Sequence, residues 1–162
     1  MTISIMLEYE KETLEHIELV GRFIDLIANR LTMRGINHDM SKLESPEREI
    51  FKEYLPWIKT SAYGTKEHDE TLKKMRPALE HHYANNPHHT EFHSDGINGM
   101  NLVDLVEMFC DWVAVSMDKG DFHDSLKISS IRFNMSKQLE SIFENTANVY
   151  FRHETARKGR GV

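Results

Sequence analysis

The chain has 162 residues, of which 40% are hydrophobic and 28% charged, and its formal net charge is −6. This length suits one domain with its own core, so we expect a single domain over 1–153 and a flexible basic tail over 154–162. The negative charge argues against nucleic-acid binding, because clustered Lys and Arg hold phosphate backbones. No stretch has the roughly 18 apolar residues of a membrane span, and no secretory signal is visible, so we expect a soluble cytoplasmic protein.

The first two helices are predicted from apolar spacing and from their breakers. Apolar residues recur at three- and four-residue steps over 7–34, which predicts an amphipathic helix that Gly35 ends. Ser45 as a cap and Pro46 at the first helical position predict the start of a second helix. We expect Pro56 to stop or bend this second helix.

The rest of the chain is also predicted to be helical. A third helix is expected over 66–84, with Pro77 either kinking it or starting its second half. A loop is expected over 88–99, a fourth helix over 100–117 and a last helix over 124–151. Because nothing alternates with the period of a strand, we predict an all-α, compact bundle of about five main helices.

Histidines are unusually frequent and clustered. The chain has ten, and six of them fall in one central stretch: His68, His81, His82, His88, His89 and His93. His16 and His82 both continue apolar rows at helical spacing and are expected to point inward. A hydrogen-bonded core histidine is the plain interpretation of each, but two on separate helices favour a metal site.

The pair His38-Asp39 follows the first predicted helix and places an imidazole beside a carboxylate. Backbone bends at such a junction can aim both groups at one ion. Lys42 follows three residues after Asp39, and its ammonium group is suited to neutralise an anionic substrate. We therefore expect this segment to contribute to a metal-dependent site.

The fourth predicted helix carries an acidic stripe, which consists of Asp104, Glu107, Asp111 and Asp118. Such a stripe is commonly the solvated face of an amphipathic helix. The alternative is that one of these carboxylates points inward and completes the site. The single cysteine, Cys110, lies in an apolar run beside the stripe and is expected to be buried packing.

The order of these residues resembles the HD superfamily of metal-dependent phosphohydrolases. The segment "HDMSK" is similar to that family's HDxxK signature, and "HHYANNPHH" followed by "MNLVDLVEMFCDW" is similar to the paired histidines and late aspartate of its HD-GYP subgroup. It also resembles a small uncharacterised phage and bacterial family with similar segments. The DGSGYP-type loop of the subgroup is absent, so cleavage of a cyclic dinucleotide is not expected.

The resemblance implies a helical domain with one or two metal ions held by His16, His38, Asp39, His82, His88 and Asp111. It favours Asp111 over Asp104 as the late ligand, and it gives catalytic roles to Lys42, His89 and Glu107. His81 is an alternative to His82 as a metal ligand. His88 or His89 is suited to bind a second ion or to contact a phosphate. Mixed imidazole and carboxylate ligands suit Mn, Fe, Co, Ni or Zn.

The favoured function is hydrolysis of a nucleotide or another small phosphate ester. An HD-type di-iron oxygenase is an alternative, because the surplus histidines can serve two irons. A non-catalytic metal-binding phage or bacterial regulator is another, for which solvent-facing Trp57, Tyr63 and Phe92 are the marker. A pH-sensing histidine surface ranks last. The sequence leaves a homo-oligomer open.

Overall fold

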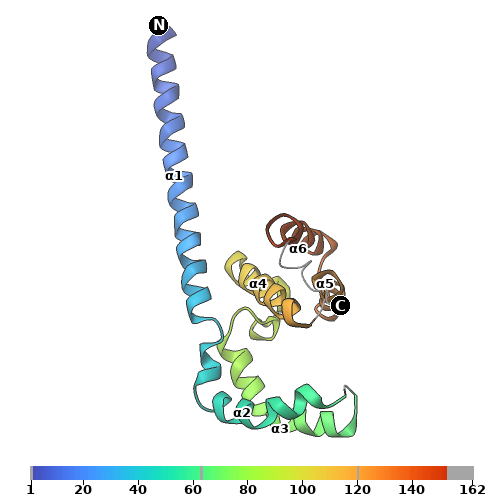
Figure 1. Cartoon of the computed structure of the whole chain (residues 1–162). Coiled ribbons are helices and arrows are strands. Elements are labelled where there is room, and N and C mark those ends of the chain that lie inside the picture. Colours follow the sequence, from blue (N-terminus) through green and yellow to red (C-terminus); the bar gives the residue numbers. More distant parts are fainter. Residues whose placement is uncertain (1, 63, 120, 153–162) are drawn as a thin grey trace. The chain divides into compact units, whose positions relative to one another are not determined.

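The computed structural model describes residues 2–62, 64–119 and 121–152, and within them all regular structure is helical (Figure 1). The chain divides into two units, Met1–Asn37 and His38–Val162. The single domain expected over 1–153 stays a prediction, and the expected tail over 154–162 lies outside the described residues. No helix in the described part combines the length and apolar character that a membrane crossing requires.

The first unit is one helix, α1 (Thr2–Asn37). The predicted amphipathic helix is therefore confirmed, but its predicted end at Gly35 is wrong. Gly35 continues the helix, and the left-handed residue that follows is Asp39, with φ 58° and ψ 15°. Most of the apolar side chains described for α1, Val20 and Phe23 among them, are exposed, and so is His16.

The second unit begins with a short 3-10 helix, η1 (Met40–Leu43), followed by α2 (Glu47–Thr60) and α3 (Lys66–Asn85). α2 and α3 lie against each other (Figure 1) and bury Phe51, Met75 and Ala78 between them.

Two prolines, Pro56 and Pro77, lie inside continuous helices. Pro56 does not stop α2, and Pro77 does not restart α3. Both side chains are exposed. Each removes one hydrogen bond on a side of the helix where water can satisfy the carbonyl group that is left over. Pro46 is the N-cap residue of α2, one position later than the predicted cap at Ser45.

After α3 the predicted loop contains two short 3-10 helices, η2 (Thr90–Phe92) and η3 (Gly96–Gly99). α4 (Leu102–Lys119), α5 (Phe122–Arg132) and α6 (Lys137–Tyr150) then pack around a second apolar cluster. The buried members of this cluster are Met108, Phe109, Val113, Phe122, Leu126, Met135, Phe143 and Ala147.

The single last helix predicted over 124–151 is wrong, because the chain turns between α5 and α6. Asn134 adopts a left-handed conformation with φ 49°, which asparagine tolerates better than most residues. Ser136 then caps α6 by accepting a hydrogen bond from the Leu139 amide. Asn and Ser were the local signals for this break, and the apolar period running through them hid it.

Candidate metal centre

The His38-Asp39 pair lies at the start of the second unit, immediately before η1. The left-handed backbone of Asp39 turns the chain there, and the Lys42 amide donates a 2.9 Å hydrogen bond back to the Asp39 carbonyl. The Lys42 ammonium contacts Asp39 Oδ2 at 2.5 Å. Because one carboxylate oxygen faces the lysine, the other, Oδ1, is available to the histidines.

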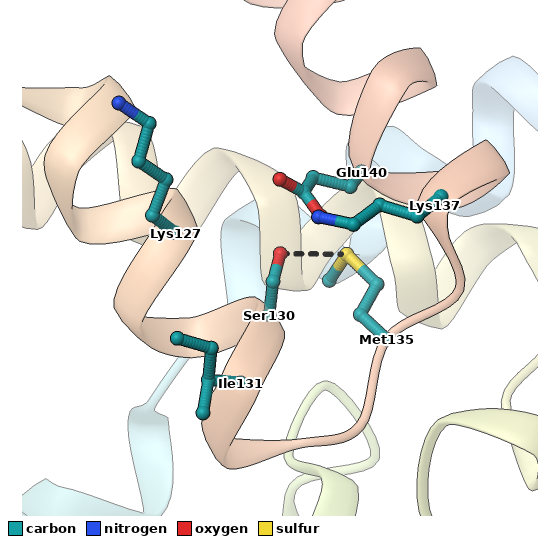
Figure 2. Close-up of a pocket in the computed structure, with 6 residues that line it drawn as sticks. All are labelled: Lys127, Ser130, Ile131, Met135, Lys137 and Glu140. Atoms are coloured by element: carbon teal, nitrogen blue, oxygen red, sulfur yellow. Dashed lines mark hydrogen bonds and ion pairs between the residues drawn. The ribbon is translucent and has the colours of Figure 1, made fainter.

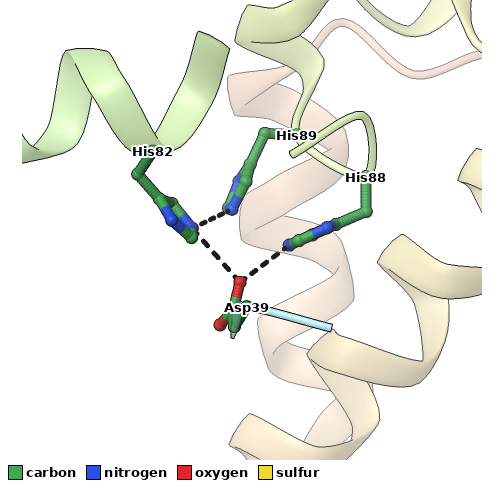
Figure 3. A group of neighbouring side chains, drawn as sticks. All are labelled: Asp39, His82, His88 and His89. Atoms are coloured by element: carbon green, nitrogen blue, oxygen red, sulfur yellow. Dashed lines mark hydrogen bonds and ion pairs between the residues drawn. The ribbon is translucent and has the colours of Figure 1, made fainter. Parts of the chain in front are cut away.

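Asp39 forms one group of ligand candidates with His82, His88 and His89, shown in Figure 3. His82 Nε2 lies 3.3 Å from Asp39 Oδ1, and His88 Nε2 lies 3.5 Å from the same oxygen. His82 Nε2 and His89 Nε2 are 2.9 Å apart. The end of α3 and the segment after it thus bring three imidazoles to one carboxylate.

A second group combines His38, His88 and Asp111, so His88 belongs to both groups. His38 Nε2 lies 3.6 Å from Asp111 Oδ1 and 3.5 Å from Asp39 Oδ2. The rings of His38 and His88 are tilted against each other, with centroids 4.5 Å apart. Asp111 belongs to α4, so the two groups together combine side chains from the segments around α3 with one side chain from α4.

Two buried glutamates hold the other ring nitrogens. Glu107 Oε1 lies 2.9 Å from His38 Nδ1 and 3.1 Å from His88 Nδ1. Glu47, whose exposed fraction is 0%, places Oε2 2.8 Å from His82 Nδ1 and Oε1 2.7 Å from His81 Nδ1. A carboxylate at Nδ1 favours the proton there, which leaves the Nε2 lone pair free for a metal.

Three of the histidine rings are therefore oriented in the same way. In His38, His82 and His88, Nδ1 faces a buried glutamate, and Nε2 faces the aspartates and the neighbouring imidazoles. This is the arrangement by which metalloproteins fix the tautomer and direction of histidine ligands.

The spacing of the donor atoms also fits an ion. Two ligands about 2.0–2.1 Å from one ion lie roughly 2.9–3.4 Å apart, depending on coordination geometry. Three separations within the first group are 2.9, 3.3 and 3.5 Å, and all of its donor atoms lie within 4.8 Å of one another. Asp39 Oδ1 and His88 Nε2 are buried atoms with no hydrogen-bond partner, which is unusual unless a further group satisfies them. The donor set present therefore fits a divalent transition metal.

The pKa values of the clustered side chains are shifted in different directions. Contacts with Asp111 and Glu107 raise the pKa of His38 to about 10. Burial, together with the charges of His88 and His82, lowers the pKa of His89 to about 3. Burial raises the pKa of Asp39, but its contacts with His82 and Lys42 outweigh burial and hold that pKa below its usual range. His89 is thus neutral at neutral pH, whereas His38 carries a proton that an ion would have to displace.

A cavity of about 270 Å³ adjoins the first group. Lys42, His82 and His89 contribute to its lining, and the other lining residues are Phe51, Leu55, Met75, Leu79 and Tyr83. Two of the candidate ligands, His82 and His89, therefore line a space that can admit a small molecule.

A second hollow, of about 400 Å³, lies at the turn between α5 and α6 (Figure 2). Lys137 pairs there with Glu140 at 2.9 Å, and the Ser130 hydroxyl faces the Met135 sulfur at 3.7 Å. None of the candidate ligands lines this hollow, its two lysines are exposed, and its one carboxylate, Glu140, is paired with Lys137. It offers no comparable chemistry.

The structure brings together most of the predicted site residues, namely Lys42, His38, Asp39, His82, His88, His89, Glu107 and Asp111. His16 belongs to the α1 unit, where it is exposed, and its role as a ligand stays a prediction. His89, expected to act on the phosphate, lies among the ligand candidates.

The acidic stripe is not a solvated face. Asp104 and Glu107 are buried, and Asp111 is half-buried. Asp104 accepts a hydrogen bond from the Asn101 amide at 3.2 Å and belongs to neither ligand group. The side chain of Asp118 lies outside the described part.

The exposure of Cys110, Trp57 and Phe92 tests three further predictions. Cys110 is exposed, so its predicted burial is wrong, because its side of α4 faces away from the apolar cluster that Phe109 enters. Trp57 and Phe92 are exposed, as the regulator alternative requires. Tyr63 lies outside the described residues.

Glu47 was missed by reasoning from sequence. A glutamate in the first turn of a helix is normally explained by the helix dipole. Its two histidine partners lie 34 and 35 residues away in sequence, so no local pattern identifies it.

Fold and cluster together define an all-α protein with a group of histidines and aspartates able to hold a metal ion. The chain belongs to DUF5662, a family of unknown function, whose profile matches residues 6–149. No curated protein and no solved structure matches the chain.

Proposed function

We propose that this protein is a metal-dependent phosphohydrolase that acts on a small phosphate ester. One observation carries the proposal: four donor side chains with buried carboxylates behind them converge next to a lysine and a cavity. The similarity of His38, Asp39 and Lys42 to the HDxxK signature of the HD superfamily supports the same reaction class.

The ligand set would comprise Asp39, His82, His88 and His89, with His38 and Asp111 available to a second ion and His16 as a further predicted ligand. A divalent ion bound there would activate water and polarise a phosphoryl oxygen. Lys42 would balance the charge of the substrate. Glu47 and Glu107 would hold the imidazoles in register, and Glu107 would take up a proton passed on by His38.

In the overall reaction, the oxygen of water bonds to phosphorus and the ester P–O bond breaks. One proton of the water ends on the alcohol that leaves, and inorganic phosphate is released. This balance needs no redox partner.

Metal content and phosphatase turnover test the proposal together. Wild-type protein purified without added metal or chelator should contain one or two equivalents of Mn, Fe, Co, Ni or Zn by elemental analysis. The double variant His38→Ala/Asp39→Ala should lose the metal and at least about a hundredfold of the activity while keeping its helical circular dichroism.

The chain supplies a matched control in another of its three His-Asp dipeptides, His123-Asp124 on α5, which belongs to neither ligand group. His123→Ala/Asp124→Ala should keep both metal and activity. Unchanged phosphatase turnover in the His38→Ala/Asp39→Ala variant would refute the proposal, as would a metal-replete wild type that takes up no ion.

Two ligand groups that share His88 favour one alternative, a di-iron oxygenase. Oxygen uptake by the ferrous protein, with no phosphate released from any ester, would identify it. The regulator alternative is supported by the exposed rings of Trp57 and Phe92, and it predicts that chelation melts the protein while no activity is found.

A further inference from the structure

The cavity beside the ligand candidates has a polar end and an apolar end. Its polar end consists of Lys42, His82 and His89, which belong to the candidate metal centre. The remainder is lined by carbon-rich side chains: Phe51, Leu55, Met75, Leu79 and Tyr83. A molecule that reaches the metal centre from this cavity therefore places its anionic end at the histidines and its other end among apolar groups.

The walls of the apolar end are fixed by the core of α2 and α3. Phe51 and Met75 are buried members of that core, and Leu79 packs against it. One wall of the cavity is thus built from the packed core of α2 and α3, while Leu55 and Lys42 at its rim are exposed.

Volume limits the group that fits. An apolar cavity of about 150 Å³ accommodates one benzene molecule. The 270 Å³ here leave room for a single six-membered ring together with its bond to a phosphate.

Polarity limits the group further. Among the residues that line the apolar end, the Tyr83 hydroxyl is the one polar side-chain group, and there is no amide, carboxylate or guanidinium group. A nucleobase placed there would leave most of its ring nitrogens and exocyclic groups without partners, which is unfavourable by roughly 1–3 kcal/mol for each group. A hydrocarbon ring of phenyl size has no polar groups that could be left unpaired, so it carries no such penalty.

We propose that the apolar end of this cavity binds the organic group of the substrate, and that this group is a single apolar or aromatic ring and not a nucleobase. The inference rests on the proposed phosphohydrolase function and narrows its substrate class to monoesters of ring-sized apolar alcohols or phenols.

Binding of two phosphonates, which cannot be hydrolysed, tests the inference apart from turnover. Calorimetry on the metal-loaded full chain should find phenylphosphonate bound about tenfold or more tightly than methylphosphonate, because only the phenyl group fills the apolar end. This comparison needs no variant, so it does not depend on a substitution being tolerated.

Two leucines with the same exposed fraction, 37%, provide a matched pair of variants. Leu55 lines the cavity, whereas Leu72 does not. Leu55→Trp should fill the cavity and abolish the preference for phenylphosphonate, and Leu72→Trp should leave the preference intact.

Equal affinities for the two phosphonates would overturn the inference, as would a phenyl preference that survives Leu55→Trp, or no binding of either compound. If methyl phosphate and phenyl phosphate are then hydrolysed with equal kcat/KM, the proposed function stands without the pocket. If the phenyl preference responds to Leu55→Trp but no ester is hydrolysed, the pocket stands and the phosphohydrolase proposal fails.

Discussion

At the scale of single residues, the candidate centre depends on carboxylates that are not themselves in the ligand groups. Glu47 is fully buried and contacts both His81 and His82. Its cost of burial is offset only if those contacts are made, which indicates a fixed role.

Glu47→Gln keeps the shape of this side chain but removes its charge. We expect the metal affinity of the variant to fall about 10- to 100-fold, because the His82 ring loses the partner that fixes its tautomer. A competition titration with a chromophoric chelator measures this. Glu53→Gln on the exposed side of α2 is the control, and an unchanged affinity in Glu47→Gln would show that the glutamate only fills space.

The raised pKa of His38 predicts opposite pH trends for the stability of the metal-free protein and for its metal affinity. Its pKa in the folded protein is raised to about 10 from an ordinary 6.5. The stabilisation of metal-free protein by this proton is complete below pH 6.5 and is lost as the pH rises through 10. Metal affinity should instead rise over the same window, by about tenfold per pH unit where one proton is displaced.

Urea unfolding in excess chelator and metal titrations at matched pH values measure these two trends. An affinity that stays flat between pH 6.5 and 10 would mean that the ion leaves the His38 proton in place.

At the scale of elements, the break between α5 and α6 decides how the second apolar cluster closes. Asn134 turns the chain with φ 49°, and Met135 and Phe143 on either side of the break are both buried. A continuous helix would carry α6 away from this cluster.

Asn134→Val should destabilise the protein by about 1–2 kcal/mol, because a β-branched residue is strained in the left-handed region. The difference between urea midpoints of variant and wild type measures this. Asn148→Val, at an exposed position inside α6, is the control and should change stability little. Equal effects of the two substitutions would contradict the role given to the turn.

At the scale of the whole molecule, the candidate ligands come from the segments around α3 and from α4. An ion held by both ligand groups would tie the α2–α3 cluster to the α4–α6 cluster. An ion that binds the folded chain but not the unfolded chain shifts the unfolding equilibrium toward the folded state by mass action.

A free ion concentration about a thousandfold above Kd should therefore stabilise the wild type by about 4 kcal/mol. Differential scanning calorimetry with and without chelator measures the corresponding rise in Tm. The His38→Ala/Asp39→Ala variant should show almost no rise, and an equal rise in both proteins would place the ion elsewhere.

Sequence patterns alone predict the helical class, the approximate positions of most helices, and the histidines and aspartates from which a site can be built. These features follow from short-range patterns, namely the 3.6-residue period and the adjacency of His38 and Asp39. Breaks that run against the period, such as the one at Asn134, were lost because apolar spacing continues across them.

Only the tertiary structure decided which nitrogen of each ring faces the centre, which glutamates hold the rings, and where a cavity opens. The contacts responsible join residues far apart in sequence, 69 positions for His38 and Glu107 and 35 for His82 and Glu47. Such contacts depend on how the helices pack, and helical periodicity specifies which face of a helix is apolar but not which residue meets it.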